Sequence, residues 1–397
     1  MNTDKLKVIG TSVTLNEKLR RAAARDLPFE IEFEILNGVD CQRRGIMSPE
    51  SFDIYDQWFH SLDLLWTAGS IQPVEVAKID RWNHIGLPAG SSPGAPGHMR
   101  SNKAHGFGTR PTDVLFIQDD MTLGSATTPL IAMLPTTYNA DSFAYMADAA
   151  AGLGVEMPES WAWLLDESWH GKCTLSKDPA SSTVELALAA RSAGLVDIED
   201  PGDLSIEDID ALFEILAARQ RTGHFAKLWA SSEDSIRLMS GPSCVLGSLW
   251  SPAYYAIRGM GRKLTYAAPR EGYRGWQSGL SLSAALPAEK LEMAYAYLNW
   301  WLDGVPGAIM ARQGYYMSVT EPVRANLSPA EWDYWYEGLP ASDDLPGLSA
   351  PIVVRKGEQR EGGSHKERVE RVAVWSTIMP EHNYLVRRWR EFLDIRN

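Results

Sequence analysis

The chain has 397 residues, 45% of them hydrophobic and 22% charged, and is long enough to fold around more than one hydrophobic core. Its formal net charge is −13 without a long basic run, which argues against nucleic acid and anionic membranes as partners. No apolar stretch approaches the roughly 18 residues of a membrane-spanning helix.

The N-terminal part alternates between strand and helix patterns. Residues 7–11 (KVIGT) predict a short apolar strand, residues 15–27 have helical spacing, and residues 31–36 predict a second strand. Residues 52–56 (FDIYD) predict a third strand, and a helix is expected over residues 58–68. This β-α-β order is typical of a parallel α/β layer.

A long loop then interrupts the alternation. Residues 86–112 are dominated by Gly, Pro and Ser, and loops of this length inside compact domains are often functional. On either side, residues 74–79, 114–118 and 130–139 predict short strands.

In the middle of the chain, the sequence twice predicts a strand followed directly by a helix. After a helix expected from Trp161, residues 172–175 predict a strand, and Asp178-Pro179 predicts a helix start with an N-capping acid. Residues 244–259 repeat the plan.

Helices dominate the C-terminal part. Residues 205–218 are amphipathic, and Ser205 with Asp208 forms a capping-box pattern. Further helices are expected over 287–302, from Ser328 onward, and over 382–393. We therefore expect two α/β lobes joined by hinge strands: residues 1–132 plus 270–310, and residues 133–269. Residues 311–397 are expected to add C-terminal helices that pack across both lobes.

The cysteines are few and widely spaced. Cys41, Cys173 and Cys244 contain no CxxC pair, so a thiolate zinc site is not expected. Three separate thiols are favoured over one disulfide. Most of the 15 tryptophans are expected in the core or between lobes, with a minority at a binding site.

Several segments together resemble the extracellular solute-binding proteins of ABC importers, and within them the spermidine/putrescine-type family. They are FDIYDQW, GKCTLSKDP, GSLWSPA, EGYRGWQS and the Gly314-Tyr315 pair. The resemblance implies a two-lobe type II periplasmic-binding-protein fold with a ligand cleft between the lobes. It also implies a monomeric, periplasmic receptor that closes on a solute and delivers it to a membrane permease, without enzymatic activity. No leader pattern is visible in the sequence, so the periplasmic location follows from the resemblance alone.

The same resemblance assigns the ligand-binding residues. Mapped onto this chain they are Thr11, Ser12, Trp58, His60, Asp178, Ser181, Trp250, Tyr273, Trp276, Ser278 and Tyr315. Ser181 and Ser278 stand where the family has acids, so a long, doubly charged polyamine is disfavoured. Three indoles and one carboxylate suit a single ammonium group, because a cation over an indole face gains about 0.5–2 kcal/mol.

Alternatives remain open. If Asp178 serves as a helix cap, a small anion or zwitterion is favoured, with Arg274, Arg110 and Arg100 as candidate partners. The tyrosine pairs 254–255 and 315–316 resemble ferric-ion ligands of related proteins, but neighbours on a helix diverge by about 100°. No metal or cofactor is expected. A hydrolase on the same scaffold is the alternative of another class, although HExxH, GxSxG, GxxxxGK[ST] and GxGxxG are absent from the sequence.

Overall fold

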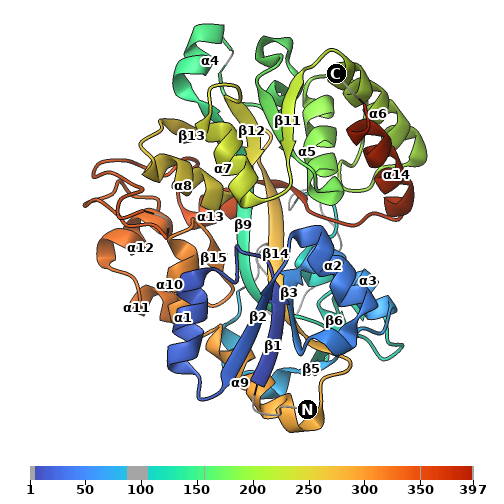
Figure 1. Cartoon of the computed structure of the whole chain (residues 1–397), viewed down its shortest axis with the longest axis vertical. Coiled ribbons are helices and arrows are strands. Elements are labelled where there is room, and N and C mark those ends of the chain that lie inside the picture. The colour runs from blue at the N-terminus through green and yellow to red at the C-terminus, as the bar shows by residue number, and fades with distance from the viewer. Residues whose placement is uncertain (1–4, 87–105, 156, 349, 396–397) are drawn as a thin grey trace. The chain divides into compact units, whose positions relative to one another are not determined.

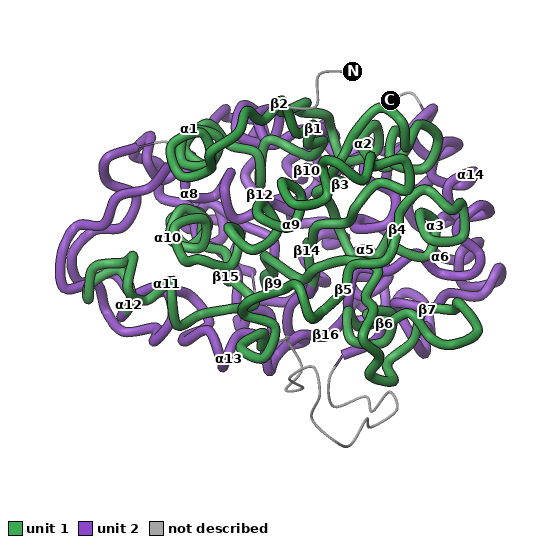
Figure 2. Tube along the Cα trace, turned by 90° about the horizontal axis from the view of Figure 1, so that it is seen from below, with its two compact units in different colours: residues 1–100, 109–139, 276–332 green, residues 101–108, 140–275, 333–397 purple. Residues whose placement is uncertain are grey.

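The computed structural model describes residues 5–86, 106–155, 157–348 and 350–395. It divides into two compact units, which Figure 2 shows in different colours. Unit 1 comprises Met1–Arg100, Thr109–Asn139 and Trp276–Trp332, and unit 2 comprises Ser101–Gly108, Ala140–Gly275 and Asp333–Asn397. The expected packing of residues 311–397 across both lobes stays a prediction.

Two long strands contribute residues to both units. They are β9 (Leu134–Met146) and β14 (Tyr273–Ser283), and every residue of both strands is buried. The boundary between the units falls inside each strand. The expectation that strands connect the lobes agrees with this division.

Unit 1 contains a mixed sheet in which parallel strands adjoin an antiparallel one. Strand β1 pairs in parallel with β2 and β3, and β3 pairs antiparallel with β14. A small second sheet has the order β5-β8-β6-β7. The remaining strands of unit 1 are β1 (Lys5–Gly10), β2 (Glu30–Ile35), β3 (Ile54–Trp58), β4 (Ile71–Gln72), β5 (Val74–Glu75), β6 (Phe116–Ile117), β7 (Leu123–Gly124), β8 (Leu130–Ile131) and β15 (Tyr316–Met317).

Helices cover the strands of unit 1. Figure 1 shows α1 on one side of β1–β3 and α2 with α3 on the other. The helices are α1 (Glu17–Asp26), α2 (Gly38–Met47), α3 (Leu62–Thr67), α9 (Leu291–Trp300), α10 (Val305–Ala311) and α11 (Glu321–Ala325), and α12 (Pro329–Trp335) spans the boundary to unit 2.

Unit 2 repeats the plan of parallel strands beside an antiparallel one. Strand β10 pairs in parallel with β11 and β12, and β12 pairs antiparallel with β9. Helix α14 packs on α6 and α5, which Figure 1 shows side by side. The strands are β10 (Cys173–Ser176), β11 (Phe225–Trp229), β12 (Leu246–Leu249), β13 (Leu264–Tyr266) and β16 (Val372–Trp375). The helices are α4 (Ala147–Leu153), α5 (Pro179–Ser192), α6 (Ile206–Arg221), α7 (Ser232–Ser240), α8 (Ser251–Gly259), α13 (His365–Glu370) and α14 (His382–Leu393).

The predicted α/β class is confirmed, with local corrections. The helix expected from Trp161 is two short 3₁₀ turns, Trp161–Leu165 and Glu167–Trp169. The break lies at Asp166, whose carboxylate accepts a hydrogen bond from the Ser168 N–H at 2.7 Å and starts a new turn. The sequence did not indicate strands β11 and β13 or helices α2, α4, α7, α10, α11 and α13.

The capping signals read from the sequence are confirmed. Ser205 and Asp208 form the expected capping box at the start of α6, with the Asp208 N–H donating to Ser205 Oγ at 3.1 Å. Helix α14 begins at His382 and ends at Leu393, as predicted. Side chains that cap a helix accept hydrogen bonds from its first N–H groups, which are close in sequence. Caps can therefore be predicted from the sequence without knowledge of tertiary contacts.

All three cysteines are free and buried, which agrees with the favoured expectation. Burial raises the pKa of Cys41, Cys173 and Cys244. Many indoles are fully buried, as expected for core residues; they include Trp161, Trp169, Trp229, Trp301, Trp335, Trp375 and Trp389. Among the described residues, no helix combines the length and apolar character needed to cross a bilayer.

Candidate functional site

The predicted ligand residues divide between the two units. Unit 1 carries Thr11, Ser12, Trp58, His60, Trp276, Ser278 and Tyr315, and unit 2 carries Asp178, Ser181, Trp250 and Tyr273.

Trp58 is the last residue of β3, and its indole contacts the ring of a residue that follows it in sequence. Its ring stacks on His60, with centroids 5.2 Å apart and planes inclined by 18°. The start of α2 lies beside it, because Gln57 Nε2 donates to the carbonyl of Gly38 at 3.1 Å. Both Trp58 and His60 are partly exposed. The structure therefore brings these two predicted residues together and leaves part of their surface accessible.

Thr11 and Ser12 follow directly after β1. The Thr11 carbonyl accepts a hydrogen bond from Leu15 N at 2.9 Å, which closes the turn into α1. Thr11 is buried, and Ser12 is partly exposed. Ser12 is the more accessible of the two residues.

Ser278 and Trp276 lie on β14 and are buried. Ser278 pairs in register with Trp58, and its hydroxyl donates to the Gln57 carbonyl at 2.9 Å. The Trp276 indole meets the Tyr315 ring edge to face at 5.0 Å, and these side chains are 6% and 2% exposed. Ser278 thus has a partner inside the sheet, and Trp276 with Tyr315 forms an aromatic pair with little free surface.

Asp56 on β3 is a buried carboxyl group that the sequence analysis did not select. It is 1% exposed, and neither of its carboxyl oxygens has a hydrogen-bond partner within the described part of the chain. Burial raises the pKa of Asp56 to about 8, which the nearby Thr14 hydroxyl offsets only in part. A carboxyl group in this environment is protonated at neutral pH.

In unit 2, Asp178 serves as the N-cap of α5. Its Oδ1 accepts from Ala180 N at 3.0 Å, and its Oδ2 accepts from the Ser181 hydroxyl at 3.1 Å. Pro179 occupies the first helical position, as the sequence predicted. The structure joins Asp178 and Ser181 directly. The carboxylate is partly exposed, so each oxygen retains a lone pair for another donor.

Trp250 is the residue before α8 and is partly exposed. Its ring meets Trp229 edge to face at 4.9 Å, and Trp229 is fully buried. The Trp229 indole N–H donates to the carbonyl of Ser248 at 3.3 Å. Trp250 therefore packs against a buried aromatic residue and is itself partly exposed.

Tyr273 occupies the core of unit 2. It is fully buried, and the Arg368 guanidinium lies 4.5 Å from its ring centroid. Arg371 lies over the same ring at 5.5 Å. These contacts give Tyr273 a packing role, and its predicted ligand contact stays untested.

The arginines proposed for an anion have carboxylate partners. Arg274 is 3% exposed, and it pairs with Glu185 at 2.6 Å and Asp141 at 3.2 Å. Burial raises the pKa of Glu185, an effect that Arg274 partly offsets. Arg110 pairs with Asp113 at 2.8 Å, and Arg100 lies outside the described residues. Arg274 and Arg110 are thus already engaged by acids of the chain.

The tyrosine pairs do not form an open phenolate site. Tyr254 and Tyr255 are buried with ring centroids 4.8 Å apart, and the Tyr254 hydroxyl donates to Glu361 at 2.6 Å. Burial raises the pKa of both phenols, which opposes the phenolate form that a hard cation needs. Tyr315 and Tyr316 are buried as well.

A model of the bacterial extracellular solute-binding protein family matches residues 56–335. This match covers well over half of the sequence. The chain therefore belongs to the bacterial extracellular solute-binding protein family. Members of this family are binding proteins of transport systems rather than enzymes, and they act outside the cytoplasm.

Solved structures support the fold assignment. A putative spermidine/putrescine ABC transporter from Listeria monocytogenes matches with a TM-score of 0.66 at 12% identity, covering 99% of this chain and 100% of that one. The TpPotD lipoprotein of Treponema pallidum matches with a TM-score of 0.64 at 10% identity, covering 98% of both chains. The binding protein AgtB of A. tumefaciens R10, in complex with agropinic acid, matches with a TM-score of 0.55 at 13% identity, covering 82% of this chain and 86% of that one. At these identities the likeness establishes the fold, and the predicted periplasmic-binding-protein fold is confirmed.

Proposed function

We propose that this protein is the solute receptor of an ABC importer and that it captures a small nitrogen-containing cation. The solute class comprises amines, quaternary amines and short polyamines, which the receptor hands to a membrane permease. The similar structure from Listeria monocytogenes carries the description of a spermidine/putrescine transporter, which is compatible with this class.

The observation that carries the proposal is the set of accessible groups among the predicted ligand residues. Trp58 and Trp250 are each partly exposed, and the ring of each contacts an aromatic neighbour. Asp178 adds a partly exposed carboxylate. Indole faces attract cations through their quadrupole, and one carboxylate balances a single ammonium charge.

The net charge of the chain also favours a cationic solute. A formal net charge of −13 raises the local concentration of cations and lowers that of anions around the protein. Capture by lobe closure is part of the proposal, because a solute that gains contacts in one conformation stabilises that conformation.

A small anionic or zwitterionic solute is the second candidate. It is favoured by the capping role of Asp178, whose two oxygens each accept a hydrogen bond from α5. The similar AgtB structure contains agropinic acid. Against this candidate, Arg274 and Arg110 are already paired with carboxylates.

Thermal-shift screening followed by calorimetry tests the proposal with the intact chain. The panel contains amines, betaines, amino acids, sulfonates and phosphonates, and we expect a concentration-dependent rise in Tm with the nitrogenous cations. Trp250→Ala and Trp58→Ala should each weaken binding about tenfold or more, which corresponds to about 1.4 kcal/mol.

Trp82→Ala is the matched control. Trp82 is also partly exposed and meets Phe116 edge to face at 6.1 Å, but it is not among the predicted ligand residues. Its replacement should leave the solute affinity unchanged. Wild-type affinity in both site variants would exclude the two indoles from the site.

A further inference from the structure

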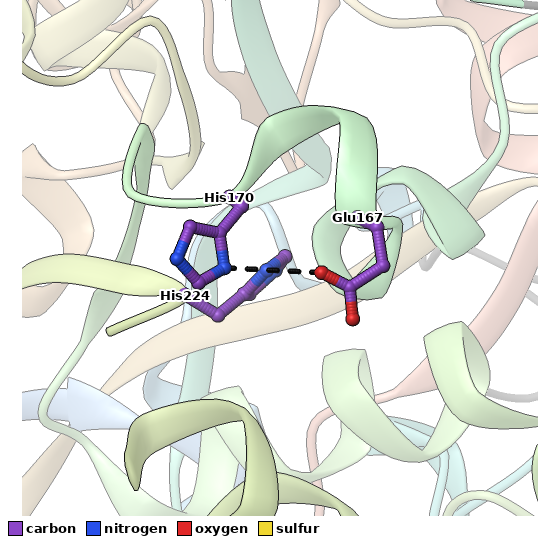
Figure 3. Close-up of side chains that lie close together, drawn as sticks. All are labelled: Glu167, His170 and His224. Atoms are coloured by element: carbon purple, nitrogen blue, oxygen red, sulfur yellow. Dashed lines mark ion pairs between the residues drawn. The ribbon is translucent and has the colours of Figure 1, made fainter. Parts of the chain in front are cut away.

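A cluster of metal-ligating side chains lies in unit 2, apart from the predicted solute-binding residues. Glu167, His170 and His224 each offer one ligand atom, and these atoms lie within 4.8 Å of one another. Figure 3 shows the three side chains converging. We propose that this cluster is a binding site for a divalent transition-metal ion of the zinc type.

The backbone brings the three residues together for identifiable reasons. Glu167 begins a 3₁₀ turn that ends at Trp169, and the His170 N–H donates to the Glu167 carbonyl at 3.0 Å, which keeps these two residues close together. His224 comes directly before β11, which pairs in parallel with β10. The Gly171 N–H donates to the His224 carbonyl at 2.9 Å, so the segments that enter these two strands are tied together.

His224 is the observation that points to a ligand. Its side chain is fully buried, and Nε2 lies 2.9 Å from the carbonyl oxygen of Leu164. A carbonyl only accepts hydrogen bonds, so Nε2 carries the proton and Nδ1 carries a lone pair. Within the described residues Nδ1 has no hydrogen-bond partner. A buried imidazole whose other nitrogen is fixed by a backbone carbonyl has the arrangement of a typical metal-ligating histidine.

The other two ligands are exposed and adjustable. His170 Nδ1 lies 3.8 Å from Glu167 Oε2. Two ligand atoms of a tetrahedral zinc ion at bond lengths of about 2.1 Å are about 3.4 Å apart. The ligand atoms of the cluster therefore have to approach one another, and the exposed side chains of His170 and Glu167 can rotate to do so. Two histidines and one glutamate form a ligand set found in zinc proteins, with water in the fourth position.

Arg219 and Asp166 carry opposite charges beside the cluster. Arg219 pairs with Glu167 Oε1, which leaves Oε2 for the ion and makes Arg219 a partner that orients the carboxylate. At His224 the charge of Arg219 opposes positive charge, and the smaller effect of Asp166 favours it.

Zinc titration of the full, tag-free chain after chelator treatment tests the site. We expect one Zn²⁺ per chain by calorimetry and a Tm that rises with zinc concentration. His170→Ala and Glu167→Gln should each weaken zinc binding tenfold or more. Both side chains are exposed, so these variants are expected to fold. Co²⁺ should give the absorption of a low-coordinate site with nitrogen ligands in the parent chain and lose it in both variants.

His84→Ala is the matched control. His84 is exposed and lies 3.5 Å from Glu321, so it offers a histidine–glutamate pair outside the cluster. Its replacement should preserve the zinc affinity. Absence of zinc binding, or equal affinity in the parent and both cluster variants, would overturn the proposal. Solute-induced changes in Tm should persist in His170→Ala, which separates this site from the solute site.

Discussion

Gly38, the first residue of α2, lies against the indole of Trp58. A Cβ atom on Gly38 would come within 2.7 Å of Trp58 Cζ3. Gly38→Ala should therefore displace the indole and weaken solute binding. Overpacking of this kind costs about 1–3 kcal/mol of unfolding free energy, which urea denaturation measures.

Gly152→Ala in α4 serves as the comparison. A Cβ atom at Gly152 would meet no heavy atom within 4 Å. Alanine in a helix is more stable than glycine by about 0.5–1 kcal/mol, so this variant should gain stability and keep its solute affinity. Equal stability and equal solute affinity of the two variants would contradict the close packing of Gly38 against Trp58.

Asp56 should make the stability of the protein depend on pH. Its pKa is raised to about 8 in the folded chain, whereas an unfolded aspartate titrates near about pH 4. Between these values the folded chain holds a proton that the unfolded chain has released. The unfolding free energy should therefore fall as pH rises through this window.

Asp56→Asn tests this prediction, because the amide mimics the protonated acid and does not ionise. We expect the variant to match the parent near pH 4. At pH 8 it should exceed the parent by more than about 1 kcal/mol, since one pKa unit corresponds to about 1.4 kcal/mol. Urea denaturation across the pH range measures the difference, and a difference independent of pH would contradict the assignment.

Arg274 pairs with two buried acids, so its replacement should strongly lower the unfolding free energy. Arg274→Met leaves Glu185 and Asp141 buried without their cation, and breaking such a cluster costs about 3–5 kcal/mol. Arg237→Met removes the exposed pair with Asp234 and should cost less than about 1 kcal/mol. Equal losses in the two denaturation curves would argue against a buried charge cluster.

Asp178→Asn separates the charge of Asp178 from its capping role. Asparagine caps helices about as well as aspartate, so the stability of α5 should change little. Binding of a cationic solute should weaken about tenfold or more, and binding of an anion should not. Calorimetry with one solute of each charge decides between the two candidates. Asp208→Asn in α6, outside the predicted site, controls for the general loss of one negative charge.

Much of the fold was predictable because its signals are local. The apolar run before Gly10 predicts strand β1, and the capping box at Ser205 predicts the start of helix α6, each from a few neighbouring residues. Helix α2 was missed because its sequence, GVDCQRRGIM, has two glycines and weak apolar spacing. Its capping residue Asn37, which accepts a hydrogen bond from Asp40 N at 2.9 Å, was the available signal.

The candidate site was only partly predictable. Family likeness selected Trp58, Trp250 and Tyr273 alike as ligand residues, which stay a prediction. It could not indicate that Tyr273 is buried against Arg368, because burial is a tertiary property. The raised pKa of Asp56 could not be predicted from the sequence either, because it arises from burial in the folded chain and not from neighbours in sequence. The proposed metal cluster joins His224 to two residues more than fifty positions earlier in the chain, so its spacing matches no short motif.

The native thiols also bear on how the protein can be engineered. Cys41, Cys173 and Cys244 are shielded and held in the unreactive protonated form. A new cysteine placed on the surface should thus be the only residue that maleimide dyes modify in the folded chain. Fluorescent reporters could then be attached at chosen positions without first replacing any residue of the natural sequence.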